Sequence, residues 1–317
     1  MTASRAALPG QRWHFQHGPI DIVIGAEGAP TAVRAAHDAA WARFEPLLGE
    51  LVAELPWLKR PVDPTRDCPL VGAVARRMWQ ACAPLVRLSE GADGFITPMA
   101  AVAGAVAQEL IAHYHRPGIR RAWVNNGGDI ALHLAPGESA SVGLFSDLAR
   151  LDSRLDSRLA AHLTQGGSLP LDGHLTVHHA DPVRGIATSG WRGRSFSLGI
   201  ADSVTVLAAT AAQADAAATV VANAVNLRHR AITRAPANQL RDDSDLGDRL
   251  VTVDVPALPA ALVRQALAGG LDCAHVLQSR GLIHAAVLMC QGQHAVLEAP
   301  TVQTARSAWS SPDLCTA

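Results

Sequence analysis

The side chains best suited to chemistry lie on one predicted helix near the middle of the chain. Residues 211–226 (AAQADAAATVVANAVN) contain no Gly or Pro and are rich in Ala, the best helix former. Asp215, Thr219 and Asn223 are spaced at i, i+4 and i+8, so they share one face of this helix. A carboxylate and a hydroxyl are the oxygen ligands that Mg²⁺ prefers, and Mg²⁺ keeps waters that a phosphate can replace. The alternative is that Thr219 bonds back to the carbonyl one turn earlier and Asp215 faces water.

A turn between two predicted strands holds a second group of candidate residues. The turn contains Asn126, Gly127 and Gly128, and Asp129 follows directly. Asn-Gly is a strong hairpin signal because both residues tolerate positive φ. A plain hairpin accounts for the Asn-Gly pair, whereas the second glycine also leaves room for a ligand to lie on the backbone.

Other elements must position these two groups. Residues 185–190 (GIATSG) read as a strand ending in a turn, and the β-branched run 203–207 (SVTVL) suits a buried strand. The patterns elsewhere predict helices at 30–55, 69–88 (kinked or split at Pro84), 98–115 and 259–268, helical turns at 271–279, and strands at 13–16, 20–24, 122–125, 129–134, 141–146, 174–179, 250–255, 282–290 and 295–298. A tandem LDSR after residue 146 is typical of an exposed amphipathic helix.

Composition excludes several classes of protein. Of 317 residues, 49% are hydrophobic and 17% are charged, as in a globular chain. The net charge of −1 argues against nucleic-acid partners, and the lack of a long apolar run argues against a membrane-spanning segment. Five cysteines without a CxxC pair fit reduced thiols and a cytoplasmic location. We expect one domain, or two fused lobes, over residues 1–300 and a disordered tail at 301–317.

Three segments in this order resemble the ApbE-like superfamily, whose best-known members are FAD:protein FMN transferases. They are MAAVAGAVAQE (99–109), VNNGGDIAL (124–132), and ATSG (187–190) followed by SVTVLA and ADAAAT (203–219). The resemblance covers roughly residues 93–226. It implies an α+β fold in which mixed or antiparallel sheets are flanked by helices, with FAD in a cleft between them.

The resemblance also implies roles for individual residues. Asp215 and Thr219 match the Asp and Thr that hold Mg²⁺ against the FAD pyrophosphate, and the main-chain carbonyl of Ala101 matches a third ligand of that ion. The remaining positions match residues beside the flavin nucleotide: Gly127, Gly128, Asp129, Thr188, Ser189 and Gly190.

One departure from the family concerns catalysis. Transferases carry a His-Ile-x-x-Pro segment between TSG and SVTV, and its histidine is the candidate general base. This chain has no His or Pro between Thr188 and His229. Losing a general base typically lowers a rate by about 10²–10⁴-fold. Asp202 is the nearby carboxylate that could substitute, so the chain resembles a side branch of the superfamily.

These observations lead to three functional hypotheses. The first is a Mg²⁺-dependent flavin-nucleotide protein that transfers FMN from FAD or hydrolyses FAD, with a small phosphate-bearing molecule as its partner. The second is a non-catalytic binding module for a nucleotide or another small anionic metabolite, which the missing base favours. The third is an enzyme acting on an unrelated small metabolite, because four small residues would widen the space where the family lysine points: Ala101, Ala103, Gly104 and Ala105.

Overall fold

The strands of this chain form one large antiparallel sheet and two small ones. The computed structural model describes residues 2–88, 95–144 and 173–300. The large sheet has the order β1 (Ser4–Leu8), β2 (Arg12–His17), β3 (Ile20–Gly28), β4 (Ile119–Asn126), β5 (Asp129–Leu134), β8 (Gly185–Ser189), β9 (Ser203–Ala208), β12 (Ala285–Cys290) and β13 (Gln293–Leu297). The small sheets pair β6 (Ser139–Leu144) with β7 (Gly173–His178), and β10 (Thr233–Pro236) with β11 (Leu250–Asp254). Every pairing is antiparallel, and the sheet takes strands from both ends of the chain.

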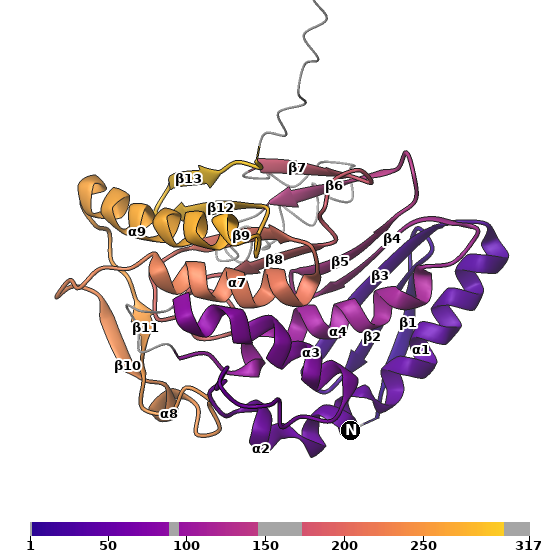
Figure 1. Cartoon of the computed structure of the whole chain (residues 1–317), viewed down its shortest axis with the longest axis horizontal. Helices are drawn as coiled ribbons and strands as arrows, with labels where there is room; N and C mark the ends of the chain where they lie inside the picture. The colour runs from indigo at the N-terminus through magenta and orange to yellow at the C-terminus, as the bar shows by residue number, and fades with distance from the viewer. Residues whose placement is uncertain (1, 89–94, 145–172, 301–317) are drawn as a thin grey trace, which may run out of the picture.

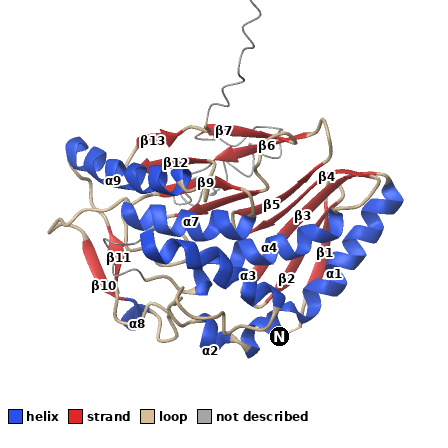
Figure 2. Cartoon of the chain, viewed as in Figure 1, coloured by secondary structure: helices blue, strands red, loops and turns tan. Residues whose placement is uncertain are grey.

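The longer helices lie along one face of the large sheet (Figure 1). They are α1 (Pro30–Ala53), α3 (Ala73–Cys82), α4 (Val102–Ile111), α7 (Ala211–Ala224) and α9 (Ala260–Ser279), and the short helices are α2 (Leu55–Leu58), η1 (Ala83–Leu88), η2 (Pro98–Ala101), η3 (Ala112–Tyr114) and α8 (Ala237–Leu240). Figure 2 shows β10, β11 and α8 set apart from the large sheet. No helix within the described ranges is long and apolar enough to cross a bilayer.

Side chains alternate between the two faces of the central strands, so two apolar clusters form on opposite faces of the sheet. Ala131, Ala187 and Val206 pack into the main core beneath the helices, whereas Leu132 and Ile186 belong to a smaller cluster on the opposite face. Since side chains alternate along a strand, Asp129 and Ser189 point to the helix side. The site residues on β5 and β8 therefore face α4 and α7.

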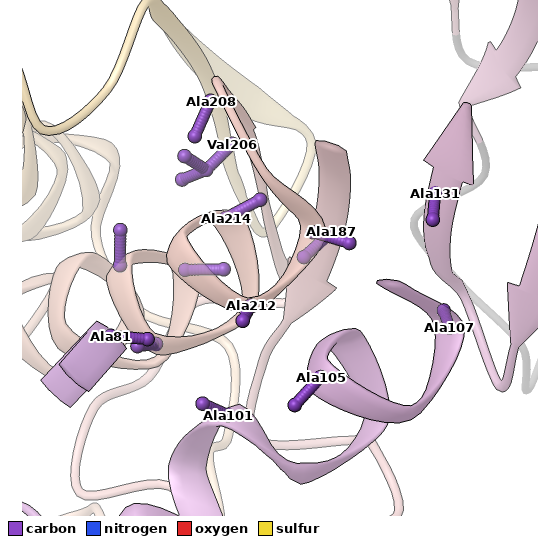
Figure 3. Close-up of a cluster of buried hydrophobic side chains, with 14 of the residues drawn as sticks. Ala81, Ala101, Ala105, Ala107, Ala131, Ala187, Val206, Ala208, Ala212 and Ala214 are labelled. Carbon is purple, nitrogen blue, oxygen red and sulfur yellow. The ribbon is translucent and has the colours of Figure 1, made fainter. Parts of the chain in front are cut away.

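The core between α4 and α7 is built from small side chains, many of them alanines (Figure 3). Gly104 lies at the closest approach: a Cβ there would lie 2.2 Å from the Ala211 carbonyl oxygen and 2.8 Å from the Asp215 Cβ. The helices are also tied by the Ala212 N–H, which donates to Gln108 Oε1 at 3.3 Å. The idea that Gly104 widens the site is therefore wrong, because the backbone of α7 fills that space.

The expected α+β class is confirmed, and most predicted elements are present. The helix predicted at 69–88 is split, as Pro84 suggested: α3 ends at Cys82, and the short helix η1 follows it. The helix predicted at 259–268 is longer than expected. It is α9, which runs to Ser279 because four buried residues keep a helical spacing: Val263, Leu267, Ala274 and Leu277. Strands β1 and β10 were not expected. The LDSR segment and residues 301–317 lie outside the described residues, and the number of domains stays a prediction.

Replacing Gly104 with alanine tests the close contact of α4 and α7. We expect Gly104→Ala to lower the free energy of unfolding by about 1–3 kcal/mol, because the added methyl overpacks the contact. The matched control is Gly49→Ala, an exposed position within α1 where a Cβ meets nothing within 4 Å. That change should instead raise stability by up to about 1 kcal/mol. Urea unfolding followed by circular dichroism measures both, and equal behaviour of the two variants would contradict the contact.

Candidate functional site

The carboxylate of Asp215 points from α7 to the start of α4. Its Oδ2 accepts a hydrogen bond from the Gly104 N–H at 2.8 Å, and the Ala103 N–H interacts with it as well. The alternative in which Asp215 faces water is therefore wrong. Burial, together with the negative charge of Asp129, raises the pKa of Asp215 well above its ordinary value.

Asp129 is the second carboxylate of this site. Its side chain is 8% exposed, and its Oδ1 accepts a hydrogen bond from the Thr188 N–H at 3.2 Å. Burial raises the pKa of Asp129 to about 7, although the Thr188 N–H and the positive charge of Arg194 favour the ionised form. Asp129 and Asp215 form no ion pair with Lys, Arg or His in the described part of the chain. We call these two side chains the carboxylate pair.

The turn between β4 and β5 places Asp129 beside α4. Gly127 and Gly128 have φ values of 67° and 112°, so the predicted tight hairpin is confirmed. The Gly128 N–H donates to Asn125 Oδ1 at 2.9 Å, which stabilises the turn. Asn126 Nδ2 donates to the Ala103 carbonyl at 3.1 Å and thereby fixes the turn against α4. We call residues 126–129 the glycine corner.

Arg194 lies against this corner. A Cβ on Gly127 would lie 3.0 Å from an Arg194 guanidinium nitrogen, so the absence of a side chain at residue 127 lets the guanidinium approach the backbone. Sequence reasoning missed Arg194. The available signal was its place in the short WRGRS run, where the family carries its histidine segment.

Thr219 and Ala101 border the same region. Thr219 is one helical turn beyond Asp215 and half-buried, and no hydrogen bond to its hydroxyl is found among the described residues. The alternative in which this hydroxyl bonds back to the preceding turn is therefore wrong. Ala101 is fully buried at the junction of η2 and α4, and η2 contacts α7. Their expected roles as metal ligands stay predictions.

The three residues of the TSG motif differ in what their side chains do. The Thr188 hydroxyl shares a hydrogen bond of 2.9 Å with Thr205 on the face away from the helices, so only its main chain contributes to the site. Ser189 lies on the helix side by alternation. A Cβ on Gly190 would lie 2.3 Å from the Asp202 carbonyl oxygen, so this glycine permits close packing of the chain.

Asp202 is engaged by other parts of the protein. Its Oδ2 accepts a hydrogen bond of 2.5 Å from the Gln291 N–H in the turn between β12 and β13, and its Oδ1 lies 3.4 Å from Arg192 Nε. Both carboxylate oxygens therefore stabilise local structure. This arrangement favours a structural role for Asp202 over the expected role as a base.

The carboxylate pair fits a divalent cation in chemistry and charge. Two like charges without a cationic partner are unfavourable, and carboxylate, hydroxyl and carbonyl oxygens are suitable ligands for Mg²⁺. Among the described residues, no three His, Cys, Asp or Glu side chains form a metal-binding cluster. An ion here would complete its shell with waters or with the phosphates of a ligand. The expected phosphate-sized cavity stays a prediction. Two cavities lined by described residues lie elsewhere, one at His275 to Ser279 and the other between Gln80 and Gln213.

The chain is similar to several archaeal proteins and to solved structures. The chain is 38% identical over 132 residues to a UPF0280 protein of Methanothermobacter thermautotrophicus, covering 41% of this chain and 43% of that protein. It is 33% identical over 205 residues to a UPF0280 protein of Methanopyrus kandleri, covering 64% of this chain and 69% of that protein. The matches to the first relatives thus span less than half of their length. The crystal structure of the ApbE protein of Thermotoga maritima is 12% identical, with a TM-score of 0.45, over 94% of this chain and 97% of that one.

A family profile matches nearly the whole chain. The family is described as AbpE bacteria, and the match extends over residues 5–296. It includes the glycine corner, the TSG motif and the helix that bears Asp215. The chain therefore belongs to this family, and the predicted membership of an ApbE-like branch is confirmed.

Proposed function

We propose that this protein binds FAD together with Mg²⁺ and cleaves the pyrophosphate of FAD, passing FMN to an acceptor or to water. The observation that supports this most is the carboxylate pair. Asp215 and Asp129 come from distant parts of the sequence, and both carboxyl groups lie where main-chain N–H groups of α4 and β8 orient them. Buried carboxyl groups without an ion pair are unfavourable for packing alone, and groups with strongly perturbed pKa values cluster at functional sites.

Asp215 would hold the ion together with Thr219 and the Ala101 carbonyl, as the family resemblance implies. Asp129 adds a second negative charge beside it. When bound, Mg²⁺ would neutralise the pyrophosphate and polarise the phosphorus under attack. The chain itself contributes the orientation of the carboxylates and a glycine corner that a nucleotide can approach without a Cβ clash.

The proposed reaction transfers FMN from FAD to the hydroxyl group of an acceptor or to water. An acceptor hydroxyl oxygen attacks the phosphorus of the FMN half, and the bond from that phosphorus to the bridging oxygen breaks. AMP leaves with the bridging oxygen, and the proton of the attacking hydroxyl passes to water. With water as the acceptor, the products are FMN and AMP.

A specific observation also favours a second candidate, a binding module that holds the nucleotide without cleaving it. The family histidine is missing, and the carboxylate that could replace it, Asp202, is bonded to Gln291 and placed near Arg192. Such a module would be stabilised by FAD and Mg²⁺ without releasing AMP.

Release of AMP tests the catalytic proposal. Purified protein incubated with FAD and Mg²⁺ should release AMP, and Asp215→Ala should slow this by roughly 100-fold or more, because a charged ligand of the ion is lost. Asp272→Ala, an exposed carboxylate on α9, is the matched control and should behave as wild type. Chromatography of the nucleotides provides the measurement. If FAD stabilises the protein without release of AMP, the binding module is supported over the enzyme. If FAD neither stabilises the protein nor yields AMP, both candidates are overturned.

The pH dependence of stability tests the carboxylate pair itself. A carboxyl group with a raised pKa in the folded state binds its proton more tightly there than in the unfolded state. The contribution of this proton binding to the free energy of unfolding is therefore fully present below about pH 4. It is lost as the pH rises through about 7, the pKa of Asp129. The loss amounts to at most about 4 kcal/mol for a shift of some three units.

We therefore expect Asp129→Asn to raise the melting temperature at pH 8 without Mg²⁺, and to raise it clearly less at pH 5. Mg²⁺ should stabilise the wild type at pH 8 and stabilise Asp215→Asn much less. Asp272→Asn controls for the loss of a surface charge. Thermal unfolding at the two pH values measures these effects, and the same pH slope for wild type and Asp129→Asn would refute the coupling.

A further inference from the structure

Arg194 is a cation without a hydrogen-bond partner at the edge of the carboxylate pair. Its side chain is exposed, and within the described residues it forms neither a hydrogen bond nor an ion pair. Its guanidinium nevertheless lies over the backbone of Gly127, and its charge acts on Asp129. An Arg that is held near a carboxylate, but does not pair with it, keeps all five N–H donors available to a ligand.

The segment that carries Arg194, residues 191–199, is fixed on both sides of this residue. On the side before Arg194, the Trp191 N–H donates to the Ala201 carbonyl at 3.0 Å. On the other side, Asn223 Oδ1 accepts hydrogen bonds from Ser197 Oγ at 3.1 Å and from the Leu198 N–H at 2.8 Å. We call this segment the arginine loop.

The small sheet anchors the same loop from outside. The Thr252 N–H of β11 donates to the Ser197 carbonyl at 2.8 Å, and Arg241 lies over the ring of Phe196 at 5.1 Å. Because Asn223 shares its helix face with Asp215, one face of α7 positions both the carboxylate and the arginine loop. The place of Arg194 beside the corner is thus set by its surroundings.

We propose that Arg194 is an anion-binding residue that binds the phosphate oxygens of the bound nucleotide beside the glycine corner. The inference rests on the proposed function and deepens it, since it names the group of the ligand that is recognised. A guanidinium binds phosphate through two parallel charge-assisted hydrogen bonds, and the missing side chain at residue 127 leaves the approach open. A phosphate between the ion and Arg194 would have positive charge on both sides.

Binding of three probes tests this inference: FAD, ADP and inorganic pyrophosphate, each titrated calorimetrically in the presence of Mg²⁺. Arg194→Ala should weaken every probe that binds the wild type by about ten- to hundredfold, because a charge-assisted hydrogen bond is lost. Arg194→Lys keeps the charge but loses the forked geometry, so it should weaken binding less. The affinity for Mg²⁺ alone should not fall in either variant.

Arg264→Ala is the matched control, since it removes an exposed arginine from α9, and it should bind as wild type does. If Arg194→Ala does not fold, Arg194→Gln replaces it as the charge-neutral variant. Equal binding of FAD by wild type and the neutral variant overturns the role of Arg194 and leaves the proposed function standing. Arg194-dependent binding of ADP or pyrophosphate without FAD binding supports the role and overturns the flavin assignment. If the wild type binds none of the three probes, both the role of Arg194 and the proposed function are overturned.

Discussion

The hydrogen bond from the Gly104 N–H to the Asp215 carboxylate is the contact on which the site depends. It forms because α4 and α7 approach so closely that a Cβ on Gly104 would overlap the Ala211 carbonyl. The same approach explains the alanines of the surrounding core, since larger side chains would separate the helices. It also brings Asp215 beside the glycine corner, because Asn126 ties that corner to Ala103 on the same turn of α4.

The close approach of α4 and α7 brings together two buried carboxyl groups, Asp215 and Asp129, although their proximity is unfavourable for folding. The pKa values of Asp215 and Asp129 are both raised, in each case mainly by burial, and the charge of Asp129 contributes to the shift at Asp215. Main-chain N–H groups offset part of the unfavourable energy but bring no net positive charge. Natural sequences depart from good local energetics mainly where function requires it. The pair is therefore the feature on which we base the proposal of a bound cation.

Local patterns in the sequence predicted the elements that carry the site. The helix with Asp215 follows from helix propensity, and the tight hairpin follows from the two glycines of its loop, Gly127 and Gly128. Both effects act within a few residues. The pairing of Asp129 with Asp215 depends on how distant elements pack, and no local pattern reports it. Gly104 was misread for the same reason: a small residue is compatible with an open site or with a close helix contact, and only the neighbouring α7 decides between them.

The arginine loop contains Arg194 and no histidine, which bears on the proposed chemistry. A general base acts on the attacking hydroxyl, so it lowers the barrier to reaction. A guanidinium on the phosphate stabilises charge that is present before and during the attack, and such uniform binding tightens the complex more than it accelerates turnover. In the relatives with a histidine, the corresponding segment can supply a base. Here Asn223 instead holds a loop whose exposed cation is Arg194. The role that we propose for Arg194 would therefore favour retention of the nucleotide over rapid transfer.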